Sequence, residues 1–307
     1  MLETRFKVAM LLAVLVLTSL PVMGILRGTT PPPEDPLPSA KEMVMMPSKS
    51  NEGTRNGQSF SGNDESNMML VPAGPFIRGT ALGGYDESPE RVITLDAYAI
   101  DRYEITNQQY QSFVASTGHR KAAPPSRYAK NLARMQGPDQ PVVYVSWDDA
   151  KEYCAWAGKR LPTEAEWEKA MRGTDGRLWP WGNQANGLAA NLGLPDGHEV
   201  TAPVGTFTRD ISPFGVADGT GNVMEWVADW YEENAYRDAA DQNPTGPEFG
   251  VFRVLRGGGY TNHGTDVRIT SRSKMVPDFR DETIGFRCAK SVDERRGRGE
   301  TGSVKKS

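Results

Sequence analysis

Two cysteines, Cys154 and Cys288, are the only thiols in this chain of 307 residues. They could form a structural disulfide or act as a redox pair, and each lies within a distinctive motif. Cys154 belongs to YCAWAGKRLPTEAEW (153–167), and Cys288 belongs to IGFRCA (284–289). Disulfides persist in oxidising compartments and are rare in the cytoplasm, so the location of the protein bears on which alternative holds.

The first 26 residues have the pattern of a secretory signal peptide. Arg5 and Lys7 supply the positive start, and an apolar segment follows at 8–26. This segment approaches the roughly 20 residues that span a bilayer, so an uncleaved N-terminal membrane anchor is the alternative. Either one places the body of the protein in the periplasm or outside the cell, where the two cysteines could pair stably.

Composition divides the rest of the chain into three parts. Residues 27–67 are rich in Pro, Ser, Gly, Asn and Glu and predict a disordered linker, because such a segment buries too little apolar area to fold. Residues 68–292 are expected to form one folded body, and the polar, basic tail 293–307 is expected to be disordered. The net charge of −4 argues against nucleic acid as a partner. Membrane contact is expected only through an uncleaved N-terminal segment.

The body has the residue patterns of a mixed α+β fold. Thr106 can cap one helix, and capping boxes that begin at Ser146 and Thr163 predict two more. Apolar and polar residues alternate over further segments, which predicts strands at 69–78, 91–100, 251–256, 268–271 and 285–288. Gly and Pro separate these segments and predict much irregular structure.

Two Gly-rich segments have oxygen-bearing side chains that suit a hard cation such as Ca²⁺, which takes about six to eight oxygen ligands. DGTGNVME (218–225) places Asp218 and Glu225 on either side of a turn with two glycines. NLGLPDGH (191–198) is a similar but weaker pattern. An ordinary acidic turn is the alternative, since the first spacing is shorter than that of an EF-hand.

The three histidines form no HxxxH or HExxH pair, so a helical zinc or iron site is unsupported. His119 follows a helix end and is expected at the surface. His263 lies in GGGYTNHGT (257–265), whose glycines permit sharp bends. That loop could line a pocket, or it could leave His263 exposed to solvent.

Seven motifs, in order along the body, resemble the formylglycine-generating enzyme, or sulfatase-modifying factor, family. They are MLVPAGPFIRG (69–79), DRYEITNQQYQSFV (101–114), PVVYVSWDDAKEYCAWAGKRLPTEAEWEKAMRG (141–173), WPWGN (179–183), GNVMEWVADWY (221–231), VLRGGGY (254–260) and IGFRCA (284–289). The resemblance implies a single compact domain with a C-type-lectin-like fold, much irregular structure and bound structural calcium.

The resemblance also implies the ligands of two calcium sites. The second family site falls on the side chains of Asp218 and Glu225 and on the carbonyls of Gly221 and Val223. The first family site falls on the side chains of Asn191 and Asp196 and on the carbonyls of Leu192 and His198. Asp218 stands where better-known members have Asn, a change that a hard cation should tolerate.

The family's oxidases convert a sulfatase cysteine to an aldehyde with a copper ion held by two cysteines. Asn262 and Val267 occupy those two positions here, and Gly259 replaces a serine of the family's pocket. Neither Asn nor Val supplies the sulfur that copper requires, so no copper is expected. Cys154 and Cys288 match a structural disulfide of animal members of the family.

The chain looks most like secreted relatives that lack the copper cysteines, among them a periplasmic protein needed for siderophore chromophore maturation. We therefore expect a secreted or periplasmic accessory or maturation factor that oxidatively modifies a protein, peptide or product. Its pocket is expected to contain Tyr260, Asn262, His263 and Arg272, with His263 as the acid or base. One alternative is a non-catalytic lectin-like module for a peptide, glycan or envelope protein. The other is a genuine cysteine oxidase, which requires Cys154 and Cys288 to be free and accessible.

Overall fold

The computed structural model describes residue 64 and residues 66–124, 131–193, 196–263 and 267–292, all of them within one compact unit, 50–307. The expected signal peptide or anchor (1–26), most of the expected linker and the tail lie outside the described residues. None of the helices in the described part is long and apolar enough to cross a membrane. Asp64, which precedes the expected start of the body at residue 68, contacts the body: Lys159 Nζ lies 2.8 Å from one of its carboxylate oxygens.

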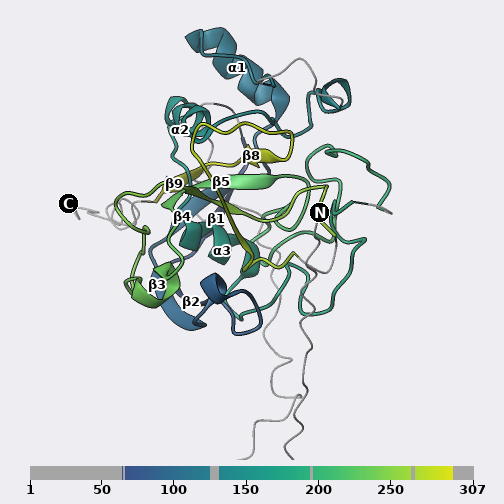
Figure 1. Ribbon diagram of the computed structural model, residues 1–307. Helices are drawn as coiled ribbons and strands as arrows, with labels where there is room; N and C mark the ends of the chain where they lie inside the picture. Colours follow the sequence, from purple (N-terminus) through teal and green to yellow (C-terminus); the bar gives the residue numbers. More distant parts are fainter. Residues whose placement is uncertain (1–63, 65, 125–130, 194–195, 264–266, 293–307) are drawn as a thin grey trace, which may run out of the picture. The chain divides into compact units, whose positions relative to one another are not determined.

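The described chain combines short helices and short strands (Figure 1). The helices are α1 (Asn107–Thr117), α2 (Trp147–Trp156), α3 (Glu164–Arg172) and α4 (Ala235–Asp238), with 3-10 turns at Tyr85–Glu87 and Leu132–Arg134. The strands are β1 (Met68–Val71), β2 (Gly74–Arg78), β3 (Arg91–Leu95), β4 (Tyr98–Asp101), β5 (Met224–Trp230), β6 (Arg253–Arg256), β7 (Arg272–Met275), β8 (Ile284–Phe286) and β9 (Ala289–Ser291). The expected α+β class is confirmed.

The three expected helix starts are confirmed. The side chains of Thr106, Ser146 and Thr163 each accept a hydrogen bond from the backbone N–H three residues later, and each start has a complete capping box. Gly118 ends α1 with a left-handed φ of 73°, which a residue without Cβ adopts at no steric cost. These contacts are local, so the sequence alone specifies them.

The strand expectations are partly wrong. Segments 69–78 and 91–100 are each divided in two, because β1 pairs with β4 whereas β2 pairs with β3. The chain bends between the two pairs, at Pro72 and Ala73 on one side and at Asp96 and Ala97 on the other. No strand forms at 268–271; β7 begins at Arg272 instead, where it pairs with β6. The alternation of apolar and polar residues identified extended segments, but it did not specify which strand each segment pairs with.

The four-stranded sheet β7-β6-β5-β8 separates two hydrophobic cores. Neighbouring residues of β5 point to opposite faces, so Trp226 joins the core with α1 and α2 whereas Val227 joins the core with α3. Figure 1 shows α1 and α2 on one side of β5 and β8, with β2 and β3 at the far end of the other side. Both faces of this sheet are therefore covered, which holds its loops in place.

A disulfide joins Cys154 of α2 to Cys288, which lies between β8 and β9. The pairing implied by the family resemblance is confirmed, with a Cα–Cα distance of 5.6 Å and no exposed surface on either residue. The bridge spans 134 residues, and by loop-closure entropy it stabilises the fold by about 5 kcal/mol. A cysteine oxidase built on these two thiols would need them free and accessible, and they are neither.

Candidate functional site

The loop that follows β6 lies where the family's oxidases hold copper, and its shape depends on close backbone packing. A Cβ on Gly258 would lie 2.7 Å from the carbonyl oxygen of Thr220, so only glycine fits there. Asn262 closes the turn in two ways: its N–H donates to the Gly259 carbonyl, and its Oδ1 accepts from the Gly259 N–H at 2.8 Å. The Asn262 side chain is thus a structural part of the loop.

Val267, at the other copper position, is a buried packing residue. It packs with Ala190, Leu192 and Trp181, and its side chain is not available to a ligand in solution. Its carbonyl oxygen accepts a hydrogen bond from Trp179 Nε1 at 2.5 Å. A thiolate copper site does not fit here, because Asn262 and Val267 carry no sulfur and both cysteines of the chain are bridged elsewhere.

Tyr260 is buried beside two residues that the sequence patterns did not single out, Tyr144 and Glu282. Tyr144 has a φ of 59°, which is rare for a bulky side chain and marks a constrained backbone. Its hydroxyl donates to Glu282 Oε2 at 2.9 Å, and Asn131 Nδ2 donates to Glu282 Oε1 at 3.4 Å. Burial raises the pKa of Tyr260, and the Glu282 carboxylate raises it further. We call these residues the Tyr144 cluster; it contains Asn131, Tyr144, Tyr260 and Glu282.

A cavity of about 550 Å³ borders the Tyr144 cluster. Its lining mixes apolar side chains with a few polar ones: Asn107, Tyr110, Gln111, Val114, Ala115, Lys121, Ala122, Leu132, Met135, Gln136, Val142, Val143 and Tyr144. This size and character suit a bound side chain or short peptide segment. The left-handed φ at Tyr144 is the sign that could have drawn attention to this place, but it is a property of the tertiary structure.

The expected pocket of Tyr260, Asn262, His263 and Arg272 is not assembled. Arg272 donates from Nε to Glu164 Oε1 at 2.6 Å and from Nη1 to the Asp86 carbonyl at 3.0 Å, so its guanidinium belongs to a different cluster. His263 is exposed, and residues 264–266 beside it lie outside the described residues. The surface alternative for His263 is the one that the structure favours. His119, expected at the surface, instead lies 2.7 Å from an Asp149 oxygen in a partly buried pair.

The second expected calcium site lies in a buried group of four carboxylates, which we call the acidic centre. Its members are Glu104, Asp210, Asp218 and Glu225. Within this group, Arg287 is the guanidinium that pairs with Glu225, at 2.7 Å from each carboxylate oxygen. Asn222 Nδ2 donates to Glu104, and the Gly205 N–H donates to Asp218.

Negative charge in the acidic centre is incompletely compensated by protein groups. Burial raises the pKa of Asp218 to about 7, with nearby Asp210 as the second cause, and burial raises that of Asp210 to about 6. Burial also raises the pKa of Glu104 well above its usual range. Four carboxylates and one paired guanidinium fit the presence of a divalent cation, which would hold these groups ionised. Here Asp218, the Gly221 and Val223 carbonyls and Glu225 would hold it.

The first expected calcium site has one feature of a cation site. The Oδ1 of Asn191 is buried without a hydrogen-bond partner among the described residues, whereas its Nδ2 donates to the Val200 carbonyl and to Asn222. Buried polar atoms are normally paired, so a cation would satisfy this oxygen. Asp196, however, accepts from the N–H groups of Leu192 and His198. Residues 194–195 lie outside the described residues.

The described residues contain no group of three or more His, Cys, Asp or Glu side chains arranged to hold a metal ion. A calcium ion at either expected site therefore depends on backbone carbonyls and an amide oxygen as well as carboxylates, which is the kind of ligand set that calcium accepts. Both calcium assignments stay predictions.

Comparison with known proteins gives one family for the whole body. The model of the Sulfatase-modifying factor enzyme 1-like domain matches residues 56–292. The formylglycine-generating enzyme of Streptomyces coelicolor is 34% identical over 283 residues, which covers 74% of this chain and 90% of that protein. The Inactive C-alpha-formylglycine-generating enzyme 2 of Bos taurus is also 34% identical, over 286 residues, and covers 74% of this chain and 89% of that protein.

A solved structure gives the same result for the fold. PvdO from Pseudomonas aeruginosa superimposes with a TM-score of 0.67 at 29% identity, and the match covers 78% of this chain and all of that chain. The expected fold is confirmed, with mixed helix and sheet in a single compact domain. The match from residue 56 agrees with the contacts of Asp64 in placing the start of the domain before residue 68. The chain belongs to the sulfatase-modifying factor, or formylglycine-generating enzyme, family.

Proposed function

We propose that this protein is an accessory or maturation factor that acts outside the cytoplasm on a protein or peptide partner, without copper–cysteine chemistry. The observation that carries the proposal is the loop after β6, where Asn262 hydrogen-bonds its own turn and Val267 packs in an apolar cluster. Copper-dependent oxidation needs thiolates at these positions. The inactive bovine relative supports the idea that this fold persists without the oxidase reaction.

The buried disulfide supports a location outside the cytoplasm. Cys154 and Cys288 are fully buried in the bridge, and disulfides of this structural kind persist in oxidising compartments. The apolar N-terminal segment expected at 1–26 supports the same location. Cell fractionation of the producing organism, with antibody detection, tests it: recovery of the protein in the cytoplasmic fraction with free thiols would contradict the proposal.

The partner is proposed to bind at the cavity beside the Tyr144 cluster. Many of the cavity's lining residues are apolar, and Tyr144, whose hydroxyl donates to Glu282, also lines it. Such a site favours an extended peptide whose apolar side chain enters the cavity and whose backbone donates to the carboxylate. Calcium is proposed as a structural cofactor of the neighbouring acidic centre.

Oxidation of a cysteine-containing sulfatase peptide tests the chemical half of the proposal. The purified protein is incubated with copper, oxygen and the peptide, and mass spectrometry records the aldehyde. We expect none from this chain and full conversion by the Streptomyces enzyme as the positive control. The double variant Asn262→Cys, Val267→Cys should acquire bound copper, because it restores both thiolates. Aldehyde formation by the unmodified chain would overturn the proposal.

A non-catalytic binding module is the second candidate, and the exposure of His263 favours it. Intact-mass measurements on secreted proteins from a deletion strain separate the two. The protein is a maturation factor if the deletion strain accumulates an unmodified partner that the wild-type strain matures, and if the His263→Ala variant fails to restore that maturation. If deletion causes no covalent change in the secreted proteins, or if the His263→Ala variant restores maturation fully, the function is binding without acid–base chemistry at His263.

A further inference from the structure

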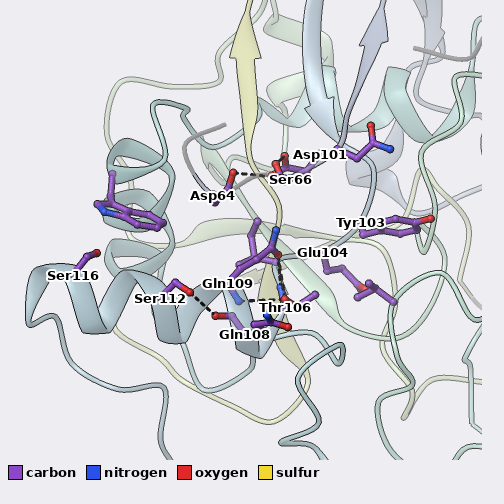
Figure 2. Close-up of a pocket in the computed structure, with 14 residues that line it drawn as sticks. Asp64, Ser66, Asp101, Tyr103, Glu104, Thr106, Gln108, Gln109, Ser112 and Ser116 are labelled. Atoms are coloured by element: carbon purple, nitrogen blue, oxygen red, sulfur yellow. Dashed lines mark hydrogen bonds between the residues drawn. The ribbon is translucent and has the colours of Figure 1, made fainter. Parts of the chain in front are cut away.

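A groove of about 650 Å³ runs along one face of α1, away from the loop after β6 (Figure 2). One wall is α1 itself; the other is formed by the residues that enter β1 and by the end of β4. Figure 2 shows the side chains of Gln108, Gln109, Ser112 and Ser116 on the first wall and those of Asp64, Ser66 and Asp101 on the second. We call this feature the polar groove.

The charged side chains of the polar groove already have partners. Lys159 Nζ lies 2.8 Å from carboxylate oxygens of both Asp64 and Asp101. Glu104 accepts from Asn222 Nδ2 at 2.9 Å and from the Val223 N–H at 3.3 Å. The fourteen lining residues include no Lys or Arg. An anionic ligand therefore has no basic side chain among the lining residues to bind.

The α1 wall presents polar groups in a regular row. Gln108, Ser112 and Ser116 are four residues apart, so they follow one another along the same helix face at intervals of about 6 Å. The Ser112 hydroxyl donates to the Gln108 carbonyl and the Ser116 hydroxyl donates to the Phe113 carbonyl, which leaves both hydroxyl oxygens as acceptors.

Gln109 adds a donor to this row. Its Oε1 accepts from the Thr106 N–H at 2.9 Å in the capping box of α1, so its amide NH₂ is the part that can bind a ligand. Donor and acceptor groups thus lie side by side along the wall. A ligand that carries several hydroxyls, each both donor and acceptor, matches such a row.

Few of the residues that line the groove have apolar side chains, and two of the lining residues, Tyr103 and Trp156, are aromatic. Only three of the lining residues are apolar: Ile105, Trp156 and Val204. The half-buried Trp156 ring is held by Phe113 and Tyr153, with ring centroids at 5.5 Å in each pair. Tyr103 lines the groove as well and is also half-buried. Rigid aromatic rings among amides and hydroxyls provide flat surface for the C–H faces of a sugar.

We propose that the polar groove binds a neutral oligosaccharide of about two to three sugar units. Pockets for drug-like ligands are lined mainly by apolar residues, whereas eleven of the fourteen residues here are polar and none is basic. The volume falls within the range of small-ligand sites. The inference goes beyond the proposed function, because the groove includes neither Asn262 nor a residue of the Tyr144 cluster.

Isothermal titration of the full chain with neutral trisaccharides tests the inference. The probes are maltotriose, cellotriose and triacetylchitotriose; trigalacturonate and a neutral Ser/Asn peptide are the comparison ligands. We expect saturable binding of at least one neutral trisaccharide at millimolar or lower concentration. The double variant Gln108→Ala, Ser112→Ala should weaken that binding about tenfold, since it removes two ligand hydrogen bonds.

Thr117→Ala is the matched control, because Thr117 is an exposed residue of the same helix that lines neither the groove nor the cavity beside the Tyr144 cluster. It should leave the dissociation constant unchanged, and far-ultraviolet circular dichroism should show that all variants keep α1. The inference is overturned if none of the three neutral probes binds, if the double variant binds as wild type does, or if the peptide or trigalacturonate binds more tightly than every neutral sugar.

Discussion

Two buried clusters of charge in this protein use the same residue types with opposite results. In the acidic centre, four carboxylates share one paired guanidinium, that of Arg287. In the second cluster, which we call the arginine network, two carboxylates are surrounded by four guanidinium groups; its members are Glu164, Glu168, Arg78, Arg172, Arg256 and Arg272. The arginine network is compensated by the protein itself, whereas the acidic centre is not.

The pKa values of Glu164 and Asp218 illustrate this difference. Burial alone raises the pKa of Glu164, but Arg272, Arg256 and Arg78 outweigh burial and hold it at about 2. In the acidic centre burial, reinforced by Asp210, outweighs the Gly205 N–H and Arg287, and the pKa of Asp218 rises to about 7. The role of a buried carboxylate therefore depends on how many cationic groups lie beside it, and burial alone does not identify that role. The arginine network holds its own cations, and a calcium ion is proposed for the acidic centre.

The largest effect is expected from Glu168→Gln in the arginine network. The change keeps the shape of a fully buried side chain but leaves Arg172 and Arg256, at 3.1 and 2.8 Å, without its charge. We expect a loss of about 3–5 kcal/mol in the free energy of unfolding, measured by urea denaturation. Added calcium should not restore it. The exposed Glu90→Gln is the control, and an equally small loss from both variants would show that the network is not compensated as described.

Acid should weaken the arginine network next. The folded pKa of Glu164, about 2, lies below its ordinary value of 4.5, so its contribution is complete above about pH 4.5 and is lost as the pH falls toward 2. The expected change is on the order of 3 kcal/mol. Unfolding free energies between these pH values measure it, and Glu164→Gln should have a flatter profile. Identical slopes for the two proteins would refute the assignment.

Calcium removal should affect the acidic centre alone. Saturation at 100 times the dissociation constant stabilises a binding protein by about 2.7 kcal/mol. We expect a chelator to lower the thermal unfolding midpoint and calcium to restore it. Asp218→Ala should abolish this difference, Asp218→Asn should keep it, and Glu168→Gln should keep it as well. If chelator and calcium give the same midpoint for the wild-type chain, the acidic centre does not bind calcium.

The smallest effect is expected at Asn262, which belongs to neither cluster and gives the scale of a neutral hydrogen bond. Asn262→Ala removes the acceptor of the Gly259 N–H and should cost about 1 kcal/mol in unfolding free energy. Asn262→Asp keeps an oxygen at that position and should cost less. A loss as large as that of Glu168→Gln would show that this loop is coupled to one of the charged clusters.

Local signals explain why part of the structure could be predicted from the sequence. The boxes at Ser146 and Thr163 involve residues three positions apart, and the helices begin where those residues place them. The strand expected at 268–271 failed because pairing with β6 decides where β7 begins. The contact between Asp64 and Lys159 joins residues 95 positions apart, so no local pattern could have predicted it.

The candidate site also contains some residues that could be identified from the sequence and others that could not. Asp218 and Glu225 were identifiable because they lie in one short segment. Glu104 and Arg287, which complete the acidic centre, come from other parts of the chain and have no signature of their own. Arg272 was expected in a pocket with Tyr260 and His263, but it pairs with Glu164 in the arginine network.

By itself, the sequence determined the family, the three helix caps and the absence of thiols at Asn262 and Val267, since each depends on residue identity or close spacing. Only the tertiary structure decided which buried charges are compensated, because most of these ion pairs join distant parts of the chain, as Glu225 with Arg287 across 62 residues and Glu168 with Arg256 across 88. The two cysteines needed both: the sequence limited them to one pair, and the packing of α2 against the end of β8 brought them within bonding distance.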